Sequence, residues 1–169
     1  MLYANYLLVQ REHEDHAALG AAFQRYVAAL DAAKDRMPPN LYDFMTASWH
    51  YDHLDRRALH DMRLRTFTVT ETQVANTQNW EISIEIVLLG AYFDRELHLR
   101  YGNVKKYSTG IPETARRTPS GSHGDLLTDE VAVLKEGECV HAMEFSSGSI
   151  FEISFCGSFD YKFGETQVP

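Results

Sequence analysis

The sequence is poor in the features that mark secreted and membrane proteins. It has only two cysteines, Cys139 and Cys156, and neither has the CxxC or CxxxC spacing of a thiolate metal site. No stretch approaches the roughly 18 apolar residues of a membrane helix, and the longest apolar run, Ile82–Leu89, has the length of a strand. The first residues carry no basic leader, which argues against a signal peptide. We therefore expect a cytoplasmic protein without a membrane partner. Its two cysteines, which could face each other in a hairpin, are expected to be buried thiols rather than a disulfide.

Recognisable catalytic motifs and excess positive charge are also missing. There is no Walker loop, dinucleotide fingerprint, HExxH zinc motif or GxSxG nucleophile elbow. The chain has 16 basic and 24 acidic residues, a formal net charge of −8. Nucleic acid is therefore not expected as a partner, because its phosphates would be repelled. The same charge suits a basic protein partner, although acidity also serves solubility alone.

The N-terminal part of the sequence predicts helices. A chain of 169 residues, 44% of them hydrophobic, can enclose the core of one domain. Residues 14–34 carry apolar side chains at the 3.6-residue spacing of an amphipathic helix. Pro38 and Pro39 end that helix, and a shorter one is predicted from Pro39 to about Trp49. The pattern at Leu2–Val9 fits either a strand or an early helical turn.

From residue 59 onward the sequence is typical of an antiparallel sheet. Apolar and polar residues alternate most regularly between Trp80 and Leu88. Short turns join the later segments, so consecutive strands must be antiparallel. The predicted strands are Met62–Thr72, Trp80–Leu88, Leu97–Tyr101, Val131–Leu134, Val140–Phe145, Ile150–Phe155 and Phe159–Phe163.

The prediction is an α+β fold, with N-terminal helices packed on one antiparallel sheet of about six to seven strands. We expect a single domain over residues 1–169, helical in 1–58 and sheet in 59–169. A long loop at residues 109–124 interrupts the sheet part and is expected to be either a mobile connector or a binding element.

Histidines and aspartates gather at the junction between the two parts. His50, His53, His60 and Asp61 lie within a dozen residues. Imidazole and carboxylate groups suit zinc or iron, so these four residues are candidate metal ligands for a metal-dependent hydrolase, or an acid/base pair. A junction between layers also uses such side chains to cap helices and tie turns, and the structural interpretation is preferred.

Short motifs in the sheet part resemble a family. They are Leu59-His60-Asp61-Met62-Arg63-Leu64, Leu99–Val104, His141–Gly148 and Phe151–Phe155. Together, over residues 59–163, they are similar to small bacterial proteins that include immunity proteins of polymorphic toxin systems. The resemblance implies a binding protein that occludes a toxin, without cofactor or catalytic residues, in which His60 and Asp61 organise the entry into a strand.

The preferred functional prediction is therefore an immunity-type inhibitor that binds a basic toxin through exposed acidic and aromatic residues. The metal-dependent hydrolase built on the His50–Asp61 cluster is the first alternative. The second is a small-ligand module with an apolar pocket lined by the Trp80 or Tyr101 strand. Exposed strand edges leave a homodimer open. The predicted partner-binding residues are Asp125, Asp129, Glu130, Glu136, Glu138, Tyr92 and Phe93.

Overall fold

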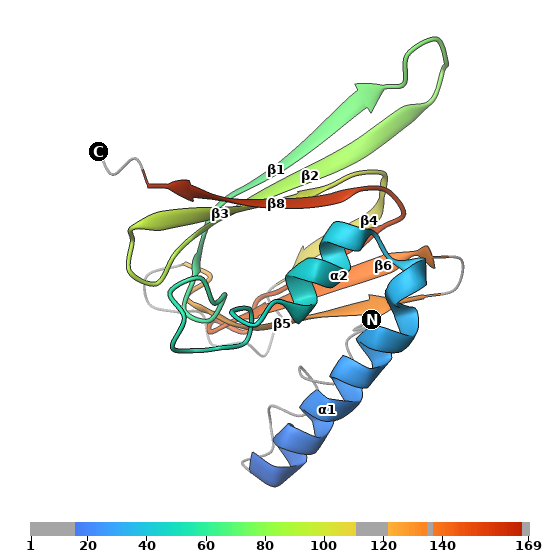
Figure 1. The fold of residues 1–169 in the computed structure, drawn as a ribbon. Helices are drawn as coiled ribbons and strands as arrows, with labels where there is room; N and C mark the ends of the chain where they lie inside the picture. The colour runs from blue at the N-terminus through green and yellow to red at the C-terminus, as the bar shows by residue number, and fades with distance from the viewer. Residues whose placement is uncertain (1–15, 111–121, 135–136, 167–169) are drawn as a thin grey trace.

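The computed structural model describes residues 16–110, 122–134 and 137–166 (Figure 1). This part of the chain contains two α-helices, a short 3-10 helix and eight strands. In chain order they are α1 (His16–Ala33), η2 (Lys34–Arg36), α2 (Pro39–Thr46), β1 (Arg63–Gln73), β2 (Trp80–Leu89), β3 (Arg95–Tyr101), β4 (Val104–Gly110), β5 (Leu126–Val133), β6 (Cys139–Phe145), β7 (Ile150–Phe155) and β8 (Phe159–Glu165).

The strands form two antiparallel sheets of four strands that face each other. Their orders are β1-β2-β3-β8 and β4-β7-β6-β5. Aromatic side chains meet between the sheets: the ring centroids of Tyr101 and Phe155 are 5.2 Å apart and those of Phe67 and Phe151 are 5.5 Å apart. The predicted α+β class and antiparallel pairing are confirmed. The prediction of a single sheet was wrong, because β8 returns to pair with β3 while β4 pairs with β7.

Helix α2 lies between the two sheets rather than on an outer face (Figure 1). The ring centroid of Phe44 in this helix lies 5.3 Å from that of Phe159 and 4.9 Å from that of Tyr161, both in β8. It lies 6.3 Å from the ring centroid of His141 in β6. On the opposite side the sheets approach directly, with Phe67 and Tyr107 5.9 Å apart. The helix therefore fills the space between β8 of one sheet and β6 of the other.

The second helix is shorter than predicted. Pro39 occupies its first turn, where the missing N–H costs no hydrogen bond. The helix ends at Thr46 because Ala47 is extended, and turns follow up to the start of β1. His50 and His53 consequently lie in these turns and do not share a helical face.

The β1–β2 hairpin extends beyond its sheet (Figure 1). β3 pairs only with Ile84–Leu89 of β2, so the two strands continue past it as a two-stranded ribbon. We call residues 70–83 the arm. Trp80, in the arm, is 62% exposed, and Val69 at its base is 37% exposed.

The start of one predicted strand was wrong, and one strand was not predicted. β5 begins at Leu126, five residues before the predicted Val131, and β4 was not predicted. Beyond Val104, every residue of β4 is exposed, as expected for the end strand of a sheet, so its sequence has no alternation. Part of the predicted 109–124 loop, like Leu2–Val9, lies outside the described residues.

Both cysteines are free, as predicted. Cys139 is buried but Cys156 is exposed, so the prediction of two buried thiols is half right. Within the described residues, no helix combines the length and the apolar character needed to cross a membrane.

Candidate functional site

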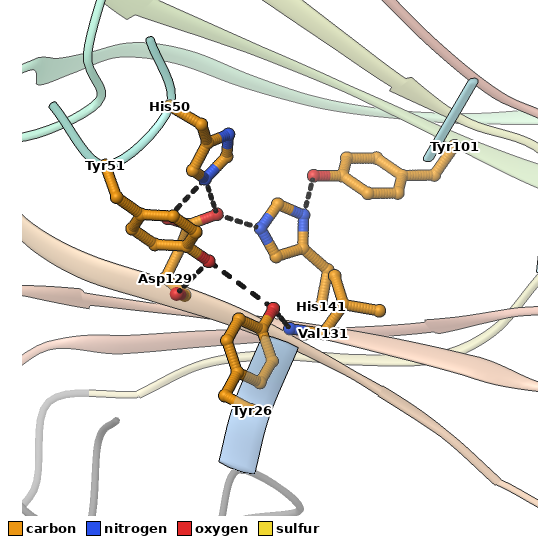
Figure 2. A network of polar contacts seen from close by, with 7 residues as sticks. All are labelled: Tyr26, His50, Tyr51, Tyr101, Asp129, Val131 and His141. Atoms are coloured by element: carbon orange, nitrogen blue, oxygen red, sulfur yellow. Dashed lines mark hydrogen bonds and ion pairs between the residues drawn. The ribbon is translucent and has the colours of Figure 1, made fainter. Parts of the chain in front are cut away.

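A buried carboxylate, Asp129, is the centre of a polar network between the sheets (Figure 2). Asp129 lies on β5 and is 1% exposed. Nε2 of His50 lies 3.0 and 3.1 Å from its two oxygens, and Nε2 of His141 lies 2.8 Å from Oδ2. The junction, β5 and β6 thus each contribute one side chain, and the carboxylate connects all three.

Tyr101 extends the network from β3 in the other sheet. Its hydroxyl group lies 2.8 Å from Nδ1 of His141. Because an ionised carboxylate only accepts hydrogen bonds, Nε2 of His141 donates to Asp129. The Tyr101 hydroxyl then donates to Nδ1 of neutral His141, or accepts from Nδ1 of the imidazolium. The network can therefore hold a proton on His141 without losing a hydrogen bond to it.

His50 differs from His141 in its second nitrogen. Nδ1 of His50 is buried and has no hydrogen-bond partner among the described residues. A proton placed there would be a buried, unpaired donor, which is costly. The two histidines therefore differ, because both ring nitrogens of His141 have hydrogen-bond partners and, among the described residues, only Nε2 of His50 does.

The protonation states follow from these surroundings. Burial alone raises the pKa of Asp129, but attraction to His50 and hydrogen bonds from His141 and His50 outweigh it and hold that pKa well below its ordinary value. Burial raises the pKa of Tyr101 well above its ordinary value. Asp129 is thus a carboxylate and Tyr101 a neutral phenol.

Two further tyrosines satisfy the open edge of β5, the end strand of its sheet. The backbone N–H of Val131 donates to the hydroxyl of Tyr26 from α1 over 2.9 Å. The hydroxyl of Tyr51 donates to the backbone carbonyl of Asp129 over 3.2 Å and lies 3.4 Å from that of Tyr26. Side chains therefore take the place of a neighbouring strand on this edge (Figure 2).

A cavity of about 490 Å³ adjoins the network. It is bounded by α1, the segment 50–60 and β5, and Asp129 and His50 line part of it. Leu19 and Phe23 of α1 and Leu127 of β5 give it apolar walls. The small-ligand alternative placed an apolar pocket along the Trp80 or Tyr101 strand, and this cavity lies elsewhere.

The structure brings together only some of the predicted metal ligands. The rings of His53 and His60 meet at the cavity with centroids 4.6 Å apart, and Nδ1 of His60 lies 3.0 Å from Oδ2 of Asp61. His50 is turned to Asp129 instead. No three histidine, cysteine, aspartate or glutamate side chains of the described residues form a group suited to a metal ion.

Asp61 does organise the entry into β1, by a route that the sequence did not suggest. Its backbone has a φ of 66°, a left-handed conformation that aspartate tolerates better than most residues. Its N–H donates to the carbonyl of Leu126 over 2.9 Å, which joins the start of β1 to the start of β5.

The acidic residues predicted to bind a partner are mostly not on an open surface. Asp129 and Glu130 are each 1% exposed, so their predicted exposure was wrong. Asp125 is half-buried and pairs with Arg63 over 2.7 Å. Glu138 accepts a hydrogen bond from Ser154, and Glu136 lies outside the described residues.

The two predicted aromatic residues are exposed. Tyr92 is 61% and Phe93 52% exposed, in the turn between β2 and β3. The guanidinium of Arg56 lies 4.6 Å from the Tyr92 ring centroid and that of Arg63 lies 6.0 Å from the Phe93 ring centroid. Since Arg63 also pairs with Asp125, three of the predicted residues share one surface, whose acidic charge is balanced by arginine.

Sequence reasoning missed most of the network. Fully buried His141 was named only as part of a family motif, and no polar role was predicted for Tyr26 or Tyr51. A histidine in an otherwise apolar strand was the one available signal. Nothing in the sequence links it to Asp129, which lies 12 residues away on the neighbouring strand.

The chain matches no protein-family model, no curated protein and no solved structure. The resemblance to immunity proteins stays a prediction.

Proposed function

We propose that the chain is an immunity-type protein that inhibits a basic toxin in the cytoplasm by forming a complex, with the arm as its main contact surface. The observation that carries this proposal is the projection of the β1–β2 hairpin past the end of β3, with Trp80 62% exposed (Figure 1).

An apolar row runs along one face of the arm. The pairs Val69–Ile84, Glu71–Ile82 and Gln73–Trp80 lie on the same face, which places Val69, Ile82 and Trp80 in one row beside Glu71 and Gln73. The other face of the arm carries Thr70, Thr72, Glu81 and Ser83. Exposed apolar rows of this kind mark interaction sites, and tryptophan is among the residues that contribute most to protein interfaces.

The charge of the arm supports a basic partner. Its only charged residues are Glu71 and Glu81, and the whole chain has a net charge of −8. A basic toxin would be attracted to this surface before contact, and the carboxylates would flank the apolar row at contact.

The arm also offers backbone groups for strand addition. β1 is an end strand of its sheet, and Trp80–Ser83 of β2 have no partner in β3. The N–H and C=O groups that face outward there can pair with an extended segment of the partner. A two-stranded ribbon with few core contacts is marginal alone, so binding would also stabilise it.

The buried network supports a binding role over catalysis. Tyr101 and His141 are at most 1% exposed and do not line the cavity, which only His50, Tyr51 and Asp129 of the network reach. Their arrangement serves instead to connect the two sheets and the junction.

The test is co-expression with the product of the adjacent reading frame in a sensitive host. Survivors are counted and a complex is sought by gel filtration. Wild-type protein should rescue growth, and Trp80→Ala should weaken the complex about 30-fold or more, since loss of an interface hot spot costs about 2 kcal/mol or more.

Tyr92→Ala is the matched control, because Tyr92 is equally exposed but lies at the opposite end of β2. Circular dichroism should show both variants folded. Loss of rescue in Tyr92→Ala with none in Trp80→Ala would place the interface at the other end of the sheet and contradict the role of the arm. A toxic neighbour that the wild-type chain does not neutralise would contradict the immunity function.

A further inference from the structure

We propose that the cavity between α1, the segment 50–60 and β5 binds an organic monocarboxylate with an apolar body, held with its head group against His53 and His60. This site is separate from the arm, and the proposal does not depend on toxin binding.

The size and walls of the cavity fit such a molecule. Its volume of about 490 Å³ lies within the range of natural ligand sites. Leu19, Phe23, Leu59 and Leu127 line it, and Leu19 keeps 39% of its surface exposed in this state. An apolar body placed there would remove the Leu19 side chain from water, which is favourable.

The polar groups of the cavity favour an anion over a cation. His53 and His60 are polar side chains of its wall, with ring centroids 4.6 Å apart. Nδ1 of His60 lies 3.0 Å from Oδ2 of Asp61, and this contact orients the His60 ring. Two adjacent imidazoles can each donate one hydrogen bond to the two oxygens of a carboxylate.

Asp129, the carboxylate that the described residues place in the cavity wall, does not reverse this preference. Asp129 is 1% exposed, and its oxygens are already occupied by Nε2 of His50 and Nε2 of His141. A carboxylate head at His53 and His60 leaves the buried network unchanged.

A series of ten-carbon probes tests the head group. Decanoate, decanol and decylammonium are titrated into the full chain at neutral pH by calorimetry, and the melting temperature is recorded with each. Decanoate should bind about tenfold or more tighter than decanol, since charge-assisted hydrogen bonds exceed about 1.4 kcal/mol. Decylammonium should bind no better than decanol. Tighter binding of decylammonium, or no binding of decanoate, would overturn the proposal.

Gly20 provides a variant that closes the cavity without disturbing the fold. Gly20 lines the cavity, and a Cβ atom built on it meets nothing within 4 Å. Gly20→Phe should place a ring in the cavity and abolish decanoate binding, while helix α1 gains from the loss of glycine. Ala21→Phe is the matched control, because Ala21 is exposed on the same helix and does not line the cavity.

The double variant His53→Gln, His60→Gln separates the head group from the apolar walls. It should reduce the affinity for decanoate to that for decanol and leave the affinity for decanol unchanged. An unchanged preference for decanoate in the double variant, or full binding in Gly20→Phe, would show that decanoate binds elsewhere.

Discussion

The hydroxyl oxygen of Tyr26 accepts a hydrogen bond from the backbone N–H of Val131, with 2.9 Å between oxygen and nitrogen. Tyr26 belongs to α1 and Val131 to β5, 105 residues apart in the chain. Because β5 is the end strand of its sheet, this N–H would otherwise point at a strand that is not there. The bond fastens the first helix to the sheet and closes part of an edge that could pair with another chain.

Removal of this hydroxyl should destabilise the protein. Tyr26→Phe leaves the buried N–H of Val131 without an acceptor, and we expect the free energy of unfolding to fall by about 1–3 kcal/mol. Urea denaturation measures the change. Tyr42→Phe is the control, because the Tyr42 hydroxyl donates to Asp31 at an exposed position, and its loss should cost less than about 0.5 kcal/mol. Equal effects of the two variants would contradict the role assigned to Tyr26.

Replacement of the central carboxylate should have a larger effect. Asp129→Asn removes the charge that both His50 and His141 contact, and loss of one member of a buried pair costs about 3–5 kcal/mol. Denaturation at neutral pH tests this. A variant as stable as the wild type would show that the network contributes no net stability.

The same residue should control acid sensitivity. The pKa of Asp129 in the folded protein lies below its ordinary value of 3.8. Its contribution to stability is therefore fully present above about pH 4 and is lost as the pH falls through the folded pKa. The difference in unfolding free energy between wild type and Asp129→Asn should be constant from pH 7 to 5 and shrink from about pH 4 downward. A difference that grows on acidification would contradict this.

Two glycines should respond in opposite ways to the same substitution. Gly124 has a φ of +79°, and an added Cβ would run into Oγ of Ser146, which accepts a hydrogen bond from the N–H of Asp125. Gly124→Ala should cost more than about 1 kcal/mol. Gly20→Ala lies in open space within α1 and should add up to about 1 kcal/mol. Thermal denaturation of the pair compares them, and a shift of the same sign in both would refute the assignment.

The two thiols should differ in reactivity. Cys156 is exposed, whereas burial raises the pKa of Cys139 to about 11. A thiol reagent at pH 8 should modify Cys156 rapidly and Cys139 only after unfolding, because the thiolate is the reactive form. Mass spectrometry of the labelled native protein would identify the site. Fast labelling of Cys139 in the native state would contradict its burial.

The alternation of apolar and polar residues was sufficient to predict strands that have one buried and one exposed face. The alternation from Trp80 to Leu88 predicted β2 because one face of that strand meets the core and the other meets water along much of its length. A different local signal, Pro39, predicted the start of α2, because proline is favoured in the first turn of a helix. β4 was missed because, after Val104, neither of its faces is buried.

The pairing of distant segments was not open to such reasoning. The separation into two sheets depends on β8 pairing with β3 and β4 with β7, and period-two patterns are the same in either arrangement. Asp129 was predicted to be an exposed carboxylate that binds a partner, but it is 1% exposed. Its burial depends on Tyr51 and His50, which are about 80 residues earlier and reach it only in the folded chain.

The arm separates residues that can vary from the residues that keep the fold stable. Core residues of this protein cannot change without loss of stability, but apart from Ile82, which packs against the core, the residues of Thr70–Gln73 and Trp80–Ser83 are exposed. Mutations in the arm can therefore accumulate, and its side chains can follow a changing partner, while the scaffold is inherited unaltered. Exchange of residues 70–83 between two divergent members of such a lineage should transfer partner preference and leave the melting temperature nearly the same.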